Sequence, residues 1–158
     1  MACIMTDSLL KAIDDYFGVL TKFTEVCPED LWAEKFAGWP IWQYFWHALW
    51  INDRFLPGTP MVSPPGATDE LALFQAKSDT PPSKAALAKL WAEQRPKTEA
   101  FVKSLTDTTM LQRNELVYNL LKIEWTNVFS AWKLHSHAFY HLGTFDAALR
   151  QRGLPGIY

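Results

Sequence analysis

The sequence is poor in cysteine and contains no long uninterrupted apolar run. Its two cysteines, Cys3 and Cys27, form neither a disulfide framework nor a CxxC motif, so we expect two reduced, incidental thiols. No apolar run approaches the roughly 20 residues that a membrane span needs. The first residues also lack the basic region and the continuous apolar stretch of a signal peptide. We therefore expect a cytoplasmic protein with no membrane partner.

An excess of charge of one sign is also missing. The chain has 15 Lys and Arg residues against 17 Asp and Glu residues, which gives a formal charge of −2. Because proteins that bind nucleic acid usually carry a basic patch, this balance argues against nucleic acid as the main partner. The length of 158 residues corresponds to about one domain, 1–158, which is long enough to bury a core without disulfides.

Aromatic residues, by contrast, are abundant. The chain has eight tryptophans, and most of them lie between Trp32 and Trp50. Large aromatic rings carry much of the area that a core buries, so we interpret most of these residues as core residues. A minority of the rings could instead line a ligand cavity.

Apolar residues recur at helical spacing in the first third of the chain. Over residues 5–26 they lie three or four apart, which predicts an amphipathic helix that ends before Pro28. A second helix is predicted over 38–56, because Pro40 suits a first turn and no breaker follows before Pro57. This second segment is apolar on nearly every side, so we expect other elements to surround it.

Proline then marks a long connection. Residues 57–66 contain four prolines and two glycines, which argues against any regular element. A short helical piece is predicted over 68–77. The residues at 80–83 are typical of a helix start, and apolar spacing predicts a third helix from there to Leu105, with a bend at Pro96.

The last third of the chain contains one clear helix and one ambiguous segment. Within the ambiguous segment 106–125, a turn is predicted at 107–109, and residues 115–123 fit either an extended connection or an early start of the last helix. Residues 126–153 contain no proline and close with arginines and a glycine, which predicts one long helix. Four helices with a long connection between the second and the third predict an all-α, four-helix bundle.

Two histidines lie on the apolar stripe of the last predicted helix. His137 and His141 are four residues apart, so their rings lie one turn above another and can reach one metal ion. His47 lies in the second predicted helix, which a bundle can bring beside the last one. Three imidazoles that leave coordination positions open are typical of a catalytic metal site. His135 lies about 200° around the helix from His137, so we expect a solvated side chain that points away.

Each histidine also has a simpler interpretation. A single histidine on an apolar helix face is more often a hydrogen-bonded core residue than a metal ligand, and this applies to His47 taken alone. The pair His137 and His141 fits a metal site and a hydrogen-bonded core about equally well. Gln43 and Asp53 flank His47 in sequence, and only Gln43 shares its helix face. We expect packing or solvated roles for both.

Two other metal chemistries are less compatible with the sequence. A carboxylate-bridged di-iron bundle needs Glu-x-x-His pairs, and the sequence has none. Haem ligation by two histidines would leave the third histidine and the crowded aromatic residues unexplained. Imidazole ligands suit zinc, nickel, copper and iron, and of these we expect zinc or nickel.

The histidines and their neighbours carry a family resemblance. The chain resembles the DinB/YfiT-like superfamily of metal-dependent proteins in three segments. These are WHAL, which contains His47, HAFYHLG, which contains His137 and His141, and the closing LRQRG. The resemblance implies a four-helix bundle, often a homodimer, that holds a divalent metal through His47, His137 and His141. Many members have Arg-Gly-Gln after the last histidine, whereas this chain has Leu-Gly-Thr at 142–144.

The resemblance also implies a range of functions. Some members resemble transferases or isomerases that use a low-molecular-weight thiol, mycothiol or bacillithiol, and others are known as stress-associated proteins. A metal held by three histidines can lower the pKa of a bound thiol or water. We therefore expect a metal-dependent transferase, isomerase or hydrolase with a small-molecule substrate. The alternative is a non-catalytic, dimeric, stress-associated bundle with a vestigial or structural metal.

Overall fold

The computed structural model describes residues 4–78 and 80–157 and shows an all-α protein. Its helices are α1 Ile4–Val26, α2 Glu29–Ala33, α3 Ile41–Arg54, α4 Asp69–Ala72, α5 Lys84–Ser104, α6 Glu115–Leu121 and α7 Asn127–Gln151. Within the described residues, the sheet structure consists of one small antiparallel hairpin, β1 Lys35–Phe36 and β2 Trp39–Pro40. In its register Lys35 pairs with Pro40 and Phe36 pairs with Trp39.

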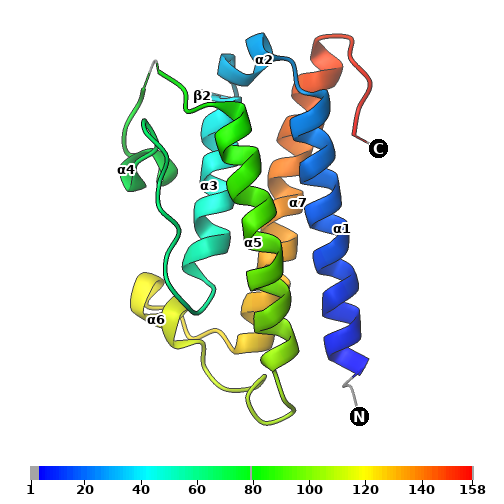
Figure 1. The fold of residues 1–158 in the computed structure, drawn as a ribbon, viewed down its shortest axis with the longest axis vertical. Coiled ribbons are helices and arrows are strands. Elements are labelled where there is room, and N and C mark those ends of the chain that lie inside the picture. The colour runs from blue at the N-terminus through cyan, green and yellow to red at the C-terminus, as the bar shows by residue number, and fades with distance from the viewer. Residues whose placement is uncertain (1–3, 79, 158) are drawn as a thin grey trace.

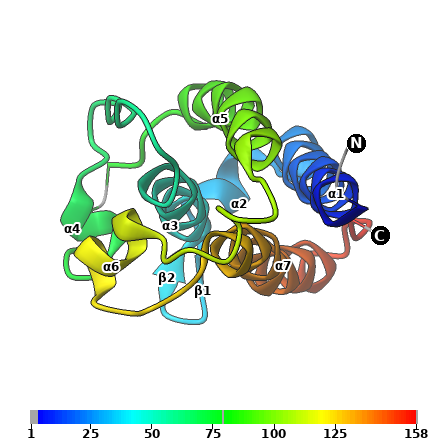
Figure 2. The same cartoon turned by 90° about the horizontal axis from the view of Figure 1, so that it is seen from below.

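The four long helices α1, α3, α5 and α7 form the bundle (Figure 1). Viewed from below (Figure 2), α1 lies beside α5 and α7, and α3 lies beside the same two helices. The helices α3 and α5 run in the same direction, so the connection 55–83 returns along the length of the bundle. The predicted four-helix bundle with a long second connection is confirmed. None of the described helices has the length and apolar character that a membrane crossing requires.

The second helix is shorter than the sequence indicated. Residues 35–40 form the hairpin, and α3 begins only at Ile41, after Pro40 with its extended ψ of 147°. The turn of the hairpin places Ala37 at φ 50° and Gly38 at φ 97°, in the left-handed region that glycine adopts at little cost. The prediction that the helix begins at residue 38 was wrong, because this glycine belongs to a turn.

The core is built largely from aromatic rings. Five of the eight tryptophans are buried, which confirms that most are core residues: Trp32, Trp42, Trp46, Trp50 and Trp91. Phe23 stacks on Phe145 with ring centroids 4.3 Å apart and joins α1 to α7. Phe17 packs against Trp91 at the same distance and joins α1 to α5. Each large ring that is fully buried contributes about 2–3 kcal/mol to stability, so these contacts hold the bundle together.

Cys27 packs into this core at the end of α1. The residue is buried, and burial raises the pKa of its thiol to about 12. Because the thiolate is the reactive form of cysteine, Cys27 is an unreactive packing residue at neutral pH. Cys3 lies outside the described residues.

Hydrogen bonds hold the long connection 55–83 against the outer face of α3. The indole nitrogen of Trp46 donates to the carbonyl oxygen of Thr68 at 2.8 Å, and that of Trp50 donates to the carboxylate of Asp69 at 2.7 Å. Both acceptors lie at the start of α4. Two buried tryptophans therefore set the position of α4 against α3.

The helix α4 is a single turn. It ends at Ala72, because Phe74 adopts a left-handed backbone with φ 57°. The predicted helix over 68–77 was therefore too long. The third helix agrees better with its prediction, since Ser83 caps α5 by accepting from a backbone N–H and the helix continues through Pro96.

The ambiguous segment 106–125 contains a separate helix, α6, where two interpretations of residues 115–123 were open. Asn114 caps this helix, because its side-chain oxygen accepts from two backbone N–H groups at 3.1 Å each. The helix ends at Leu121, and the following residue, Lys122, adopts a left-handed φ of 59°. An antiparallel bridge between Arg113 and Thr126 then returns the chain to the start of α7. Neither an extended connection nor an early start of the last helix was the right interpretation.

Candidate metal centre

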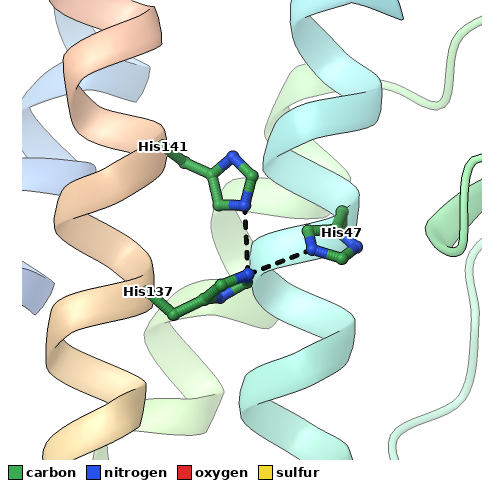
Figure 3. A group of neighbouring side chains, drawn as sticks. All are labelled: His47, His137 and His141. Atoms are coloured by element: carbon green, nitrogen blue, oxygen red, sulfur yellow. Dashed lines mark hydrogen bonds between the residues drawn. The ribbon is translucent and has the colours of Figure 1, made fainter.

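Two neighbouring helices bring three histidines together (Figure 3). His47 lies in the middle of α3, whereas His137 and His141 lie one turn apart on α7, which packs against α3. All three rings point into the space between the two helices. The structure thus gathers the residues that the sequence singled out into one group, which we call the histidine cluster.

The ring nitrogens of the histidine cluster lie at distances that suit one ion. The Nε2 atom of His137 lies 3.1 Å from Nε2 of His47 and 3.1 Å from Nε2 of His141. The candidate ligand atoms all lie within 4.8 Å of one another. Two nitrogens that each bind a zinc ion at about 2.1 Å are roughly 3.0–3.4 Å apart. The three histidines could therefore hold a metal ion.

The backbone sets the tautomer of His47. Its Nδ1 atom lies 2.6 Å from the carbonyl oxygen of Ala72 in α4. Because a carbonyl oxygen only accepts hydrogen bonds, Nδ1 carries the proton, and Nε2 directs a lone pair toward the other two rings. A hydrogen bond from the far ring nitrogen is the usual support of a histidine that binds metal.

Hydrogen bonds alone do not satisfy the three nitrogens that face each other. Nε2 of His137 has either one N–H or one lone pair, but it faces two nitrogen atoms. If it donates to His47, it has no proton left for His141. If it accepts from His141 instead, two lone pairs face each other across 3.1 Å between His137 and His47. A divalent cation would satisfy all three lone pairs, so this donor set fits a metal ion.

Burial keeps the histidine cluster neutral. The pKa of His137 is lowered to about 4 and that of His141 to about 3, first by burial and then by the charge of neighbouring imidazoles. The pKa of His47 is also lowered by burial, although its hydrogen bond to Ala72 opposes the shift. Neutral imidazole is the form that binds metal, so the cluster is in the binding form at pH 7.

Gln43 supports the segment that orients His47. Its buried side chain lies one turn before His47 on α3 and donates through Nε2 to the carbonyl oxygens of Leu71 at 2.9 Å and Ala76 at 3.1 Å. These two carbonyls flank Ala72, whose own carbonyl accepts from His47. Gln43 is therefore a packing residue that holds the backbone in contact with the cluster.

Two other polar residues considered from the sequence lie outside the histidine cluster. Asp53 is buried and accepts from the backbone N–H of Met61 and the side chain of Gln94, which makes it an anchor of the long connection. His135 points away from the cluster toward α1, and its Nε2 lies 4.0 Å from the carboxylate of Asp15. Its side chain is only 27% exposed, because α1 covers this face of α7. His135 thus points away from the cluster, as expected, but its ring is only partly solvated.

A cavity of about 480 Å³ opens beside the cluster, and we call it the aromatic cavity. Its lining includes His47, Ile51, Leu121, Trp125, Trp132 and His137. The wall formed by Leu121 and Trp125 was missed from the sequence, because the segment before α7 shows no clear apolar period. The available signal was Asn114 before Glu115, a capping residue followed by an acidic first turn.

The residues that follow His141 do not extend the cluster. Leu142 is buried in the core, and Gly143 faces open space on the exposed side of α7. Thr144 is half-buried. The Leu-Gly-Thr segment therefore offers no side chain in place of the arginine and glutamine that the family resemblance describes.

Comparison with protein families accounts for most of the chain. A family model described as the DinB superfamily matches residues 13–145, a range that includes all three members of the histidine cluster. Comparisons with curated proteins and with solved structures found no match. The chain therefore belongs to the DinB superfamily.

Proposed function

We propose that this protein is a metal-dependent enzyme in which His47, His137 and His141 bind one divalent ion, zinc or nickel. One observation carries the proposal: three Nε2 atoms converge, one of them with its lone pair fixed inward by the bond to Ala72, beside a cavity of about 480 Å³. A cavity of this size admits a small-molecule substrate. We infer a transferase, isomerase or hydrolase.

The proposed ion has three protein ligands, which leaves coordination positions for an exogenous group. When bound, a divalent ion would lower the pKa of a thiol or water and so supply a nucleophile at neutral pH. A low-molecular-weight thiol would make the enzyme a transferase or isomerase, and water would make it a hydrolase. The family resemblance favours the thiol.

The chain itself orients the proposed ligands and keeps them unprotonated. The backbone carbonyl of Ala72 keeps the proton of His47 on Nδ1, so that Nε2 is free to act as a ligand. Burial keeps His137 and His141 unprotonated at pH 7. The apolar rings of Trp125 and Trp132 line the cavity, so most of its wall offers packing surface to a substrate.

A non-catalytic homodimer is the second candidate, and one observation favours it. Two aromatic side chains on α7, Trp132 and Tyr140, are 49% and 74% exposed. Large exposed aromatic residues that lie together are typical of surfaces that a partner covers. In this alternative a second copy of the chain covers these rings and the metal has a structural role.

Metal analysis of purified variants tests the proposed ligands. We expect about one divalent ion per chain in the natural protein and less than about a tenth of that in His141→Ala, because one of three ligands is lost. His135→Ala is the matched control on the same helix and keeps its metal. Far-UV circular dichroism confirms that both variants are folded. Equal metal loss in both variants, or no metal in the natural protein, contradicts the assignment.

Cobalt substitution separates the enzyme from the structural alternative. In cobalt-loaded protein, added 2-mercaptoethanol produces a sulfur-to-cobalt charge-transfer band only where a coordination position is open to the solvent. We expect this band in the natural protein. Its absence, together with a concentration-independent dimer in sedimentation experiments, favours a closed structural metal in a non-catalytic dimer.

A further inference from the structure

The aromatic cavity has almost no polar wall. Apart from the histidines and the indole N–H groups of two tryptophans, the polar side chains that line it are Lys133, Ser136 and Tyr140. The hydroxyl of Ser136 already donates to the backbone carbonyl of Lys133 at 3.3 Å, and the Tyr140 side chain is mostly exposed. A molecule inside this cavity therefore meets aromatic and aliphatic surface over most of its area.

The charged side chain in the lining of the cavity is positive. Among the described residues of the lining, Lys133 is the only cation, and none is an aspartate or a glutamate. The Nζ atom of Lys133 lies 5.6 Å from the centre of the Trp125 ring. Among the described residues, none of the ion pairs within 4.0 Å includes Lys133. An ammonium group without an acidic partner at the wall of an apolar cavity is complementary to an anionic group on a ligand.

The same wall is unsuitable for a ligand rich in hydroxyl groups. Each hydroxyl that enters an apolar cavity loses hydrogen bonds to water, and this costs about 1–3 kcal/mol where no protein group replaces them. The Ser136 hydroxyl already donates its hydrogen to a backbone carbonyl, so the lining has few side-chain groups that could replace the lost hydrogen bonds to water. A thiol that carries a sugar therefore matches this cavity poorly.

We infer that the aromatic cavity binds a small, mainly aromatic molecule that carries a single anionic group, and that this group pairs with Lys133. The aromatic body packs between α3 and α7 against rings such as Trp125 and Trp132. The binding of this molecule does not depend on the proposed function. Only its role as the substrate rests on that proposal. The reacting part of that substrate then lies on the side of the cavity lined by His47 and His137.

Isothermal titration calorimetry with three probes of the same shape tests this inference. The probes are naphthalene-2-sulfonate, which is anionic, N,N-dimethylnaphthalene-2-sulfonamide, which is neutral, and 2-naphthylmethylammonium, which is cationic. Sulfonate is a weak metal ligand, so its binding reports on Lys133 and not on the histidine cluster. In the natural protein we expect the anion to bind about tenfold more tightly than the neutral probe and the cation to bind most weakly.

Variants of two lysines decide whether Lys133 causes this preference. In Lys133→Met the anion and the neutral probe bind equally, and in Lys133→Glu the cation becomes the preferred probe. The matched control is Lys122→Met, which removes another lysine that lies over an aromatic ring, outside the cavity lining. This control keeps the tenfold preference. Equal binding of all three probes to the natural protein, or an unchanged preference in Lys133→Met, overturns the inference.

The metal-depleted variant His141→Ala separates this inference from the proposed function. His141 does not line the cavity, so we expect the preference for the anion to persist in this variant. If the natural protein also binds no metal and keeps its preference for the anion, the ligand class is supported and the metal-dependent enzyme is rejected. One bound metal ion per chain without any charge preference rejects the ligand class alone.

Discussion

The carbonyl oxygen of Ala72 lies 2.6 Å from Nδ1 of His47, and this contact makes the long connection part of the candidate metal centre. The connection 55–83 is the segment that joins two parallel helices, and α4 is its only helix in the described part of the chain. Because the carbonyl fixes the ring tautomer, a displacement of α4 would change the lone pair that His47 presents. The fold and the site are linked through this backbone contact.

Gln43→Met therefore weakens metal binding without removing a ligand. The variant loses the two hydrogen bonds that hold the carbonyls of Leu71 and Ala76, and α4 is then free to move away from His47. We expect metal affinity to fall by about tenfold, the lower end of the effect of losing support behind a ligand. Competition with a chromophoric chelator measures the affinity. Gln75→Met is the matched control, because its side chain is exposed on the same segment. An equal loss in both variants contradicts this role.

The metal-free protein loses stability as the pH falls below about 6.5. The pKa values of His137 and His141 are about 4 and 3 in the folded state, whereas an unfolded histidine has a pKa of about 6.5. The unfolded state therefore binds more protons between these values, so the stability is complete above pH 6.5 and decreases toward pH 4 and 3. At pH 5 the loss is about 2 kcal/mol for each histidine.

Urea denaturation in the presence of a chelator measures this dependence at pH 7.5 and pH 5. His141→Gln cannot titrate at position 141, so we expect its pH-dependent loss to be about 2 kcal/mol smaller than that of the natural protein. His135→Gln provides the control, because it leaves the histidine cluster intact. The same slope in His141→Gln as in the natural protein is incompatible with a buried, neutral His141.

The sequence was sufficient to predict the bundle, because helical periodicity is a local signal. The apolar spacing in 5–26 and 126–153 reports which helix faces are buried, and that alone places His137 and His141 on one inner face. The position of His47 also follows, since a bundle has few ways to arrange a helix that is apolar on nearly every side. That these three histidines bind metal stays a prediction.

Features that depend on contacts distant in the sequence could not be predicted in this way. The bond from His47 to Ala72 spans 25 residues and uses a backbone carbonyl, which no residue pattern reveals. The wall formed by Trp125 exists because the bridge between Arg113 and Thr126 folds the chain back. His135 is half-buried only because α1 packs over it. In each case tertiary packing decides the environment of a residue whose local sequence is uninformative.

Asp53→Ala destabilises the fold and leaves the metal content unchanged. Both carboxylate oxygens accept from the backbone N–H of Met61 at 3.1 Å, and Oδ1 also accepts from Gln94 at 3.0 Å. Removing the carboxylate leaves buried donors unpaired, so we expect a loss of about 2–4 kcal/mol in the free energy of unfolding. Chemical denaturation measures the loss, and Asp107→Ala, in an exposed turn, serves as the neutral control. A fall in metal content would instead place Asp53 in the support of the site.

Gly143→Ala raises stability, although this glycine belongs to the segment that carries the family resemblance. It lies inside α7, and a Cβ atom added there meets nothing within 4 Å. Alanine reduces the conformational freedom of the unfolded chain, so we expect a gain of about 0.5–1 kcal/mol with unchanged metal content. Gly153→Ala has the opposite sign, because Gly153 adopts a φ of 71° that an L-residue reaches only at a cost. Thermal unfolding of the two variants measures both effects. A loss of metal in Gly143→Ala would show that the metal centre requires glycine at this position. A loss of stability would contradict the expected gain.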